Sequence, residues 1–269
     1  MKKTIISCVL FLTAVTAFSQ TTMKTAAEAK LSASDLAVKI ADRILATTTY
    51  EFKNAKTGKT YKSVKNLPLD MNVKVACKYN NWHYTNGVTH IALMELADKT
   101  GAKKYDDYVF KNMNFVFNEG NLDFFKKQYD QAMKDEGWYG VRKLSWHMIF
   151  RGKRLDDNGP MGASLIDLQM KHPNNSFLNY INETAEHLNY GEPRLADGTI
   201  ARIWPHENTI WADDAFMAIS FLARMAKMTG DMNYINDAAN QVIKYHKYLW
   251  CPEKRILYHC YHTDTDEHG

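Results

Sequence analysis

Apolar residues recur at helical spacing along most of this chain, and the helices that they predict come in pairs. One pair lies in ALMELADKTGAKKYDDYVFKNMNFVF, from residue 92, and another in AISFLARMAKMTGDMNYINDAANQVIKYHKYL, from residue 218. In each, the first helix is expected to stop at a Thr-Gly step, at Thr100 and Gly101 or at Thr229 and Gly230, because glycine favours the residue after a helix. The repeated unit is therefore a helical hairpin.

A third, weaker copy of the hairpin is GASLIDLQMKHPNNSFLNYINETAEHL, where Pro173 and Asn174 separate the two helices. A single helix is expected earlier, over residues 34–48, with Ser34 as its N-cap, followed by a loop over residues 52–68. Repeated hairpins stack as a solenoid or close into a toroid. The long loops between these hairpins favour an all-α toroid with the loops at one end, since function is usually placed on such loops.

The first twenty residues, MKKTIISCVLFLTAVTAFSQ, differ from the rest of the chain. A basic start at Lys2 and Lys3 precedes an apolar run, and Ala17 and Ser19 have the spacing of a cleavage site. Residues 1–19 are therefore predicted to be a secretory signal peptide, which places the mature protein in the periplasm or outside the cell. No later segment is long and apolar enough to predict a membrane span.

Composition narrows the class of protein further. The 269 residues carry a formal net charge of +4, and loss of the two leader lysines lowers it by two, to +2, which predicts no nucleic-acid partner. The three remaining cysteines, Cys77, Cys251 and Cys260, are too few and too widely spaced for a disulfide framework or a cysteine zinc site. A bond between Cys251 and Cys260 is the one pairing left open.

Two pairs of neighbouring aspartates begin predicted first helices: Asp156 and Asp157, then Asp213 and Asp214. One interpretation is that they cap the helices and complement the helix dipoles. The other is that carboxylates from both pairs face each other across a pocket, with one acting as a general acid. The helix dipole lowers the pKa of such a carboxyl, whereas burial beside Trp211 and a second carboxylate raise it.

Aromatic, histidine and basic side chains occupy the loops that precede these helices. An aromatic plane beside polar groups suits a sugar ring, although ordinary core packing explains any single one of them equally well. The aromatic and histidine positions are Trp82, His83, Tyr84, Trp146, His147, Trp204, His206 and Trp211. The basic positions, which an anionic sugar would need, are Arg151, Lys153, Arg154 and Arg202.

The C-terminal segment LYHCYHTDTDEHG contains several potential metal ligands, His259, His262, Asp264, Asp266 and His268. It has neither a His-x-x-x-His helical pattern nor a calcium loop of the usual length. We therefore expect a solvated loop, no metal site and no cofactor.

Three segments resemble the unsaturated rhamnogalacturonyl hydrolases and their unsaturated glucuronyl hydrolase relatives, glycoside hydrolase families 105 and 88. They are WHYTNGVTHIALMELADKTGAKKY, LDDNGPMGASLIDL, and WADDAFMAISFLARMAKMTGDMNYINDAANQVIKYHKYLW followed by LYHCYH. The most specific element is Trp211, Asp213, Asp214 and Met217 at the start of an apolar helix. The resemblance implies an (α/α)6 toroid over residues 20–269, incomplete here because one helix and three hairpins are fewer than six hairpins.

The resemblance also implies an activity. Members of these families remove a 4,5-unsaturated uronic acid from the non-reducing end of oligosaccharides left by polysaccharide lyases, by hydrating the double bond. Asp213 would then be the acid and base, and Asp157 the second aspartate that holds the sugar. Substrate-binding roles follow for Trp211, His259, His83, Tyr84, Asn86, Arg202 and His206.

Two other interpretations stay open on the residues alone. One is another toroid enzyme, such as an inverting glycosidase, whose two carboxylates lie about 6.5–9.5 Å apart, or a sugar epimerase. The other is a non-catalytic helical-repeat protein that binds sugar chains. All three take a saccharide as the partner, and the sequence carries no signal for oligomeric state.

Overall fold

The computed structural model describes residues 32–152 and 154–269, so the predicted signal peptide lies outside the described residues. The chain divides into two compact units, Met1–Ala46 and Thr47–Gly269. The described part of the first unit contains all of helix α2 (Ala33–Thr47) except its last residue. Ser32 caps this helix: its hydroxyl accepts from the Asp35 backbone N–H at 3.1 Å and donates to the Asp35 carboxylate at 2.7 Å. The predicted cap at Ser34 is therefore wrong by two residues.

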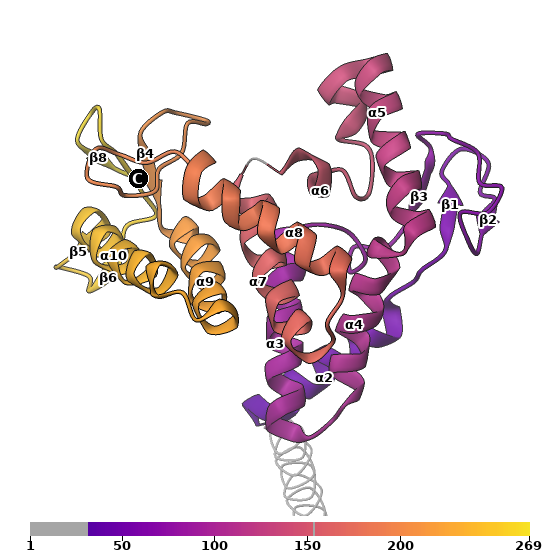
Figure 1. Cartoon of the computed structure of the whole chain (residues 1–269), viewed down its shortest axis with the longest axis horizontal. Coiled ribbons are helices and arrows are strands. Elements are labelled where there is room, and N and C mark those ends of the chain that lie inside the picture. Colours follow the sequence, from indigo (N-terminus) through magenta and orange to yellow (C-terminus); the bar gives the residue numbers. More distant parts are fainter. Residues whose placement is uncertain (1–31, 153) are drawn as a thin grey trace, which may run out of the picture. The chain divides into compact units, whose positions relative to one another are not determined.

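Three helical hairpins dominate the second unit, as the repeated pattern predicts. Their helices are α3 (Tyr84–Thr100) with α4 (Lys104–Phe117), α7 (Leu155–Lys171) with α8 (Asn175–Glu186), and α9 (Ala212–Thr229) with α10 (Met232–Leu249). The first helices pack on one another in the order α3, α7, α9, and each second helix packs on its own first helix (Figure 1). This is an all-α fold of the α/α-toroid class.

The predicted helix ends are confirmed. Gly101 and Gly230 follow α3 and α9 in the left-handed conformation, with φ of 70° and 75°, and their N–H groups bond to the carbonyls of Ala97 and Ala226. In the third hairpin, Asn174 caps α8 by accepting from the backbone N–H of the second helical residue. Local sequence signals therefore set the length of each hairpin.

Two glycines allow the first helices to approach closely. A Cβ atom on Gly87 of α3 would lie 2.4 Å from the Pro160 carbonyl carbon of α7. A Cβ on Gly159 of α7 would lie 2.4 Å from the Met217 carbonyl oxygen of α9. Both contacts are with backbone atoms, which cannot move away as a flexible side chain can. The absence of a side chain at these positions brings the N-terminal turns of the three helices together.

Other helical elements were not anticipated from the sequence. They are α5 (Glu119–Val141), α6 (Met148–Arg151) and a π-helical turn, η1 (His187–Gly191). In α5, Gly137 has φ 59° and ψ −148°, which breaks the helix. The sequence of α5 is polar and rich in glycine, so its residues predict a helix only weakly.

The loop expected over residues 52–68 contains short strands. Strand β1 (Phe52–Asn54) pairs antiparallel with β2 (Thr60–Tyr61) and with β3 (Val73–Val75). Phe52 is fully buried, and its ring lies 5.9 Å from those of Phe124 and Phe125 in α5. Packing on a hydrophobic cluster stabilises these strands, which are too short to be recognised from an alternation of hydrophobic and polar residues.

The C-terminal segment is also structured, so the expectation of a solvated loop is wrong for much of it. Strand β4 (Thr209–Trp211) pairs antiparallel with β7 (Cys260–His262), which pairs with β8 (Glu267–His268); β5 (Trp250–Cys251) pairs with β6 (Ile256–Leu257). Trp211 lies opposite Cys260, so this segment is held against the start of α9. Cys251 and Cys260 are free. Among the described helices, none is long and apolar enough to cross a membrane.

Candidate active site

Acidic side chains gather where the N-terminal turns of the first helices meet. Asp156 lies in the first turn of α7, and Asp213 and Asp214 lie in the first turn of α9. Oxygen atoms from these three carboxylates all lie within 4.8 Å of one another. Three negative charges at this separation repel strongly unless a cation lies among them.

Arg202 supplies that positive charge. Its Nε and Nη2 atoms donate to the two carboxylate oxygens of Asp214 at 2.6 and 2.7 Å. Nη2 also lies 3.3 Å from an oxygen of Asp213 and 3.7 Å from one of Asp156. The guanidinium carbon lies 4.5 Å from the centre of the Trp211 ring. The carboxylates have the spacing of a cation site, but the guanidinium already provides their counter-charge.

Asp213 and Asp214 differ sharply in burial. The Asp213 side chain is 43% exposed, whereas that of Asp214 is 2% exposed. Burial raises the pKa of Asp214 to about 6, although the Arg202 guanidinium opposes the rise. The pKa of Arg202 is raised by Asp214 and its neighbouring carboxylates, in spite of burial. Asp214 is thus one half of a buried ion pair in the first turn of α9.

Asp157 belongs to a second ion pair. Its two carboxylate oxygens accept from Nε and Nη2 of Arg151, and the side chain is fully buried. Burial raises the pKa of Asp157, and the Arg151 guanidinium opposes this rise. The buried Trp82 indole donates to the Asp157 backbone carbonyl at 2.7 Å. Asp156, and not Asp157, is therefore the α7 carboxylate that shares Arg202 with Asp213.

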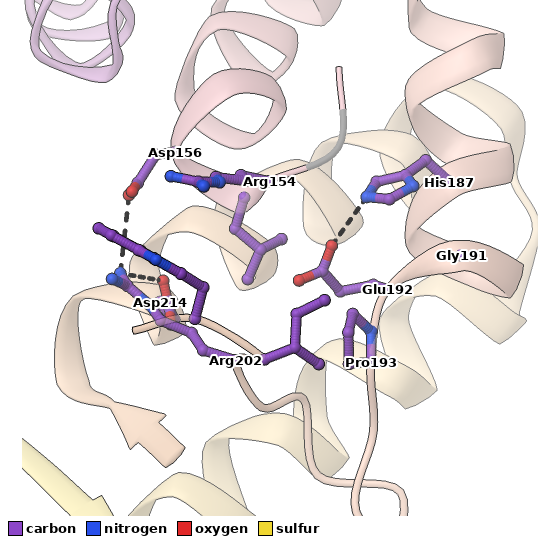
Figure 2. A pocket seen from close by; sticks show the side chains of 11 residues that line it. Arg154, Asp156, His187, Gly191, Glu192, Pro193, Arg202 and Asp214 are labelled. Atoms are coloured by element: carbon purple, nitrogen blue, oxygen red, sulfur yellow. Dashed lines mark hydrogen bonds and ion pairs between the residues drawn. The ribbon is translucent and has the colours of Figure 1, made fainter. Parts of the chain in front are cut away.

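A cavity of about 320 Å³ opens beside Arg202 and Asp214. Figure 2 shows Arg154 and Asp156 on its α7 side, with His187 and Glu192 facing each other at the η1 side. The nearest His187 nitrogen and Glu192 oxygen are 2.9 Å apart. The remaining lining residues are Leu155, Gly191, Pro193, Ile203 and Trp204. A volume of this order suits a sugar ring.

Trp211 and His259, both predicted substrate contacts, lie together at the start of α9. Their rings are 5.0 Å apart in an edge-to-face arrangement. The His259 carbonyl accepts from the Ala212 backbone N–H at 2.8 Å, so the C-terminal segment is tied to the first turn of α9. The antiparallel pairing of β4 with β7 produces this neighbourhood.

The three predicted substrate contacts at the start of α3 differ in their burial and in their partners. His83 caps α3, and its ring lies 4.5 Å from that of the exposed Tyr84. Burial lowers the pKa of His83, while Asp156 and Asp157 oppose the change, so these charges lie near it. Asn86 is buried, and its side-chain amide donates to the backbone carbonyls of Lys78 and Asn81 and to the side-chain oxygen of Asn81. Asn86 therefore holds the preceding loop, and its binding role stays a prediction.

His206 is exposed and lies in the loop before β4, outside the cavity lining. Its ring is 5.7 Å from that of His262. Of the loop tryptophans, Trp82 and Trp146 are buried in the core, whereas Trp204 is 60% exposed beside the cavity. Core packing thus accounts for two of the aromatic positions, and Trp204 keeps a free face.

The sequence did not single out the η1 residues of the cavity. His187 and Glu192 carry no motif, and only the fold brings them opposite α7. Arg154 could be recognised only as one of several basic residues beside an acidic pair. The distinction between Asp156 and Asp157 was also hidden, since both belong to the same helical turn.

Three solved structures share this fold, which defines the chain as an α/α-toroid protein. They are possible members of glycoside hydrolase family 105 from Klebsiella pneumoniae (TM-score 0.55, 13% identity) and from Salmonella enterica serovar Paratyphi A (TM-score 0.55, 14% identity), and a family 105 glycoside hydrolase from C. acetobutylicum (TM-score 0.50, 22% identity). They match 88%, 89% and 76% of this chain, and 54%, 55% and 47% of their own. The chain therefore spans about half the length of these structures.

The sequence itself identifies the family. The family model described as Glycosyl Hydrolase Family 88 matches residues 54–269, and the chain belongs to this family. No curated protein matches the sequence. The family assignment covers all three hairpins and the C-terminal strands.

Proposed function

We propose that the protein is a glycoside hydrolase that removes a 4,5-unsaturated uronic acid from the non-reducing end of lyase-generated oligosaccharides. Family membership supports the reaction class. The observation that carries the proposal is the partly exposed Asp213 carboxyl, 3.3 Å from Arg202, in a cluster of carboxylates that adjoins a cavity of sugar size. An exposed acid beside fixed charges is available to a substrate, whereas Asp214 and Asp157 are held by arginines.

In the proposed reaction, Asp213 donates a proton to C4 of the sugar, and positive charge develops on C5 and the ring oxygen. Water then adds at C5 and gives its proton back to the Asp213 carboxylate. The resulting hemiketal opens to a ketone at C5, which leaves a hemiacetal at C1. That hemiacetal collapses to an aldehyde and releases the remaining saccharide, so one water molecule is consumed and one glycosidic bond is broken.

The surrounding side chains suit this charge pattern. Asp156 and Asp214 belong to the same carboxylate cluster as Asp213, and in the proposed reaction they would stabilise the positive charge that develops on the sugar. Trp211 and His259 would form a wall of the sugar site. Asp157, paired with Arg151, would keep the start of α7 in position. It would thereby help to hold the sugar indirectly, by positioning the neighbouring residues of α7.

The test is a spectrophotometric assay on oligosaccharides that carry the unsaturated uronate, made by lyases from pectins and from glycosaminoglycans. The double bond is conjugated with the carboxyl group, so its ultraviolet absorbance should disappear as the protein acts. If neither class of oligosaccharide loses absorbance, the proposed reaction is wrong. Hydrolysis of saturated glycosides with the double-bond substrates untouched would favour a conventional two-carboxylate glycosidase.

We also propose that the protein is exported, on the basis of the leader at residues 1–19. An oligosaccharide product of extracellular lyases would be met in the periplasm or outside the cell. N-terminal sequencing of the protein recovered from fractionated cells should give Gln20 as the first residue. Recovery of intact protein from the cytosol would contradict export.

A further inference from the structure

Arg154 differs from Arg151 and Arg202 because no described residue offers it a carboxylate partner. Arg151 is paired with Asp157 through two hydrogen bonds, and Arg202 is paired with Asp214 in the same way. In the part of the chain that the structure describes, no carboxylate oxygen lies within 4.0 Å of the Arg154 guanidinium. Arg154 nevertheless lines the cavity and is partly buried.

Contacts with α7 and Trp204 position Arg154. It is the N-cap residue of α7, directly before Leu155, with an extended backbone. Its guanidinium carbon lies 4.7 Å from the centre of the Trp204 ring, so the planar group is supported on one face. The Asn158 side chain donates to the Gly152 carbonyl at 2.9 Å, which ties the preceding turn to α7. A guanidinium held in this way loses little freedom when it binds a ligand.

The electrostatic surroundings of Arg154 favour an anion. Burial and the nearby charges of Arg151 and Arg202 lower the pKa of Arg154, while Asp157 and Asp156 oppose the change. The guanidinium is thus partly desolvated beside two other cations, and the nearby carboxylates are engaged elsewhere. An anionic group of the ligand would relieve this repulsion.

The cavity beside Arg154 has the chemistry of a site for an acidic sugar. Ile203 and Trp204 on the loop after Arg202 are 65% and 60% exposed, which offers apolar surface to a sugar face. Leu155 and Pro193 add apolar lining, and Asp156 and Asp214, the carboxylates clustered with the proposed acid Asp213, border the same space. The carboxylate cluster that contains the proposed acid therefore borders the cavity that Arg154 lines.

We propose that Arg154, stacked on Trp204, binds the carboxylate of the terminal uronate and sets the preference of the site for an acidic sugar. This inference rests on the proposed function, because it names the group that recognises the substrate of that reaction. The guanidinium fork donates two parallel hydrogen bonds to the carboxylate oxygens. A neutral sugar of the same shape would leave the half-buried charge without a partner.

The experiment compares the unsaturated uronate with its methyl ester, which keeps the double bond but carries no charge. With the full chain, Arg154→Met should raise KM for the free acid by roughly 10- to 100-fold, and should change KM for the ester by less than about threefold. Arg154→Lys should restore part of the preference for the acid, because it keeps the charge but not the fork. Arg142→Met, at an exposed arginine after α5, is the matched control and should behave as the wild type.

Equal KM changes for acid and ester in Arg154→Met, or no change in either, would overturn the role of Arg154. Failure of the wild-type protein on every unsaturated substrate would instead overturn the proposed reaction. In that case, calorimetric titration with galacturonic acid and with galactose still decides the inference about Arg154. Preferential binding of the acid that is lost in Arg154→Met supports it, and binding without preference, or no binding of the acid, contradicts it.

Discussion

Arg202 binds both carboxylate oxygens of Asp214, at 2.6 and 2.7 Å, from a loop that precedes the helix on which Asp214 lies. The pair is the centre of the site, since the same guanidinium also faces Asp213 and Asp156. A buried carboxylate without its partner is strongly destabilising, so this contact should hold the loop to the start of α9.

The first prediction concerns this ion pair. Arg202→Met should lower the free energy of unfolding at pH 7 by about 3–5 kcal/mol, because Asp214 is left buried and charged. The loss should shrink at pH 5, because burial raises the pKa of Asp214 to about 6 even beside Arg202, and without Arg202 the carboxyl takes up a proton more readily still. Urea unfolding at the two pH values measures both effects. The double variant Arg202→Met with Asp214→Leu should recover much of the loss, and a single-variant loss under about 1 kcal/mol would contradict the prediction.

The second prediction separates chemistry from stability. Asp213→Asn should lower kcat on the unsaturated substrate by about 100-fold or more, because the side chain can no longer donate and recover the proton. Its carboxylate is 43% exposed, so the free energy of unfolding should change by no more than about 0.5 kcal/mol. Asp264→Asn, in the exposed C-terminal turn, is the control for loss of one surface carboxylate. Full activity of Asp213→Asn would exclude Asp213 as the acid.

The third prediction is a pH dependence of stability that originates at His90. Burial lowers the pKa of His90 from 6.5 to about 4, and its Nε2 atom lies 3.1 Å from the side-chain nitrogen of Asn112. The unfolded chain binds a proton at His90 more readily than the folded chain does. Above pH 6.5, His90 is neutral in both states and does not lower the free energy of unfolding. As the pH drops from 6.5 to 4, its protonation in the unfolded state should lower the free energy of unfolding by about 3 kcal/mol.

Unfolding measured in urea across this pH range tests the effect. His90→Leu should remove this part of the acid sensitivity, whatever it does to stability at pH 7. The exposed His206→Leu is the control, since it lies in a loop before β4 and should leave the pH profile unchanged. A His90→Leu profile that runs parallel to the wild-type profile would show that His90 is not the source.

The fourth prediction concerns the close approach of α7 and α9. Gly159→Ala should destabilise the fold by about 2 kcal/mol or more, because its Cβ would lie 2.4 Å from the Met217 carbonyl oxygen. Alanine otherwise favours a helix over glycine by about 1 kcal/mol, so the sign of the effect is diagnostic. Gly120→Ala in α5 is a milder comparison, since its nearest contact is a Val64 methyl group at 3.0 Å. A stabilising Gly159→Ala would show that the two helices can separate without cost.

Much of the helical framework followed from local signals. The Thr-Gly steps that end α3 and α9, and Asn174 before α8, act within one turn of the chain and were recognisable from the sequence. The cap of α2 is Ser32 and not the predicted Ser34, because the Ser32 hydroxyl bonds to both the backbone and the carboxylate of Asp35. Helix α5 and the short strands depend on packing partners, such as the phenylalanine cluster around Phe52, and so escaped the pattern.

The site was predicted in outline but not in detail. Adjacent residues on a helix point about 100° apart, so neighbouring aspartates meet different surroundings. Asp156 faces Arg202, whereas Asp157 faces Arg151. The sequence identified both acidic pairs and their positions at helix starts, and the family resemblance singled out Asp213 and Asp157, but the arginine that pairs with each aspartate could not be predicted from it.

Local sequence signals were enough to predict where the hairpin helices end, that acids begin two of their first helices, and that the chain resembles a family of carbohydrate enzymes. Three features required the folded chain: Arg202 joins Asp156 to the α9 aspartates, Arg154 has no carboxylate partner among the described residues, and η1 closes a cavity opposite α7. The two groups of features differ in the range of the interactions that produce them. Helix ends are set by hydrogen bonds within a turn, whereas burial and charge pairing depend on segments that are distant in the sequence.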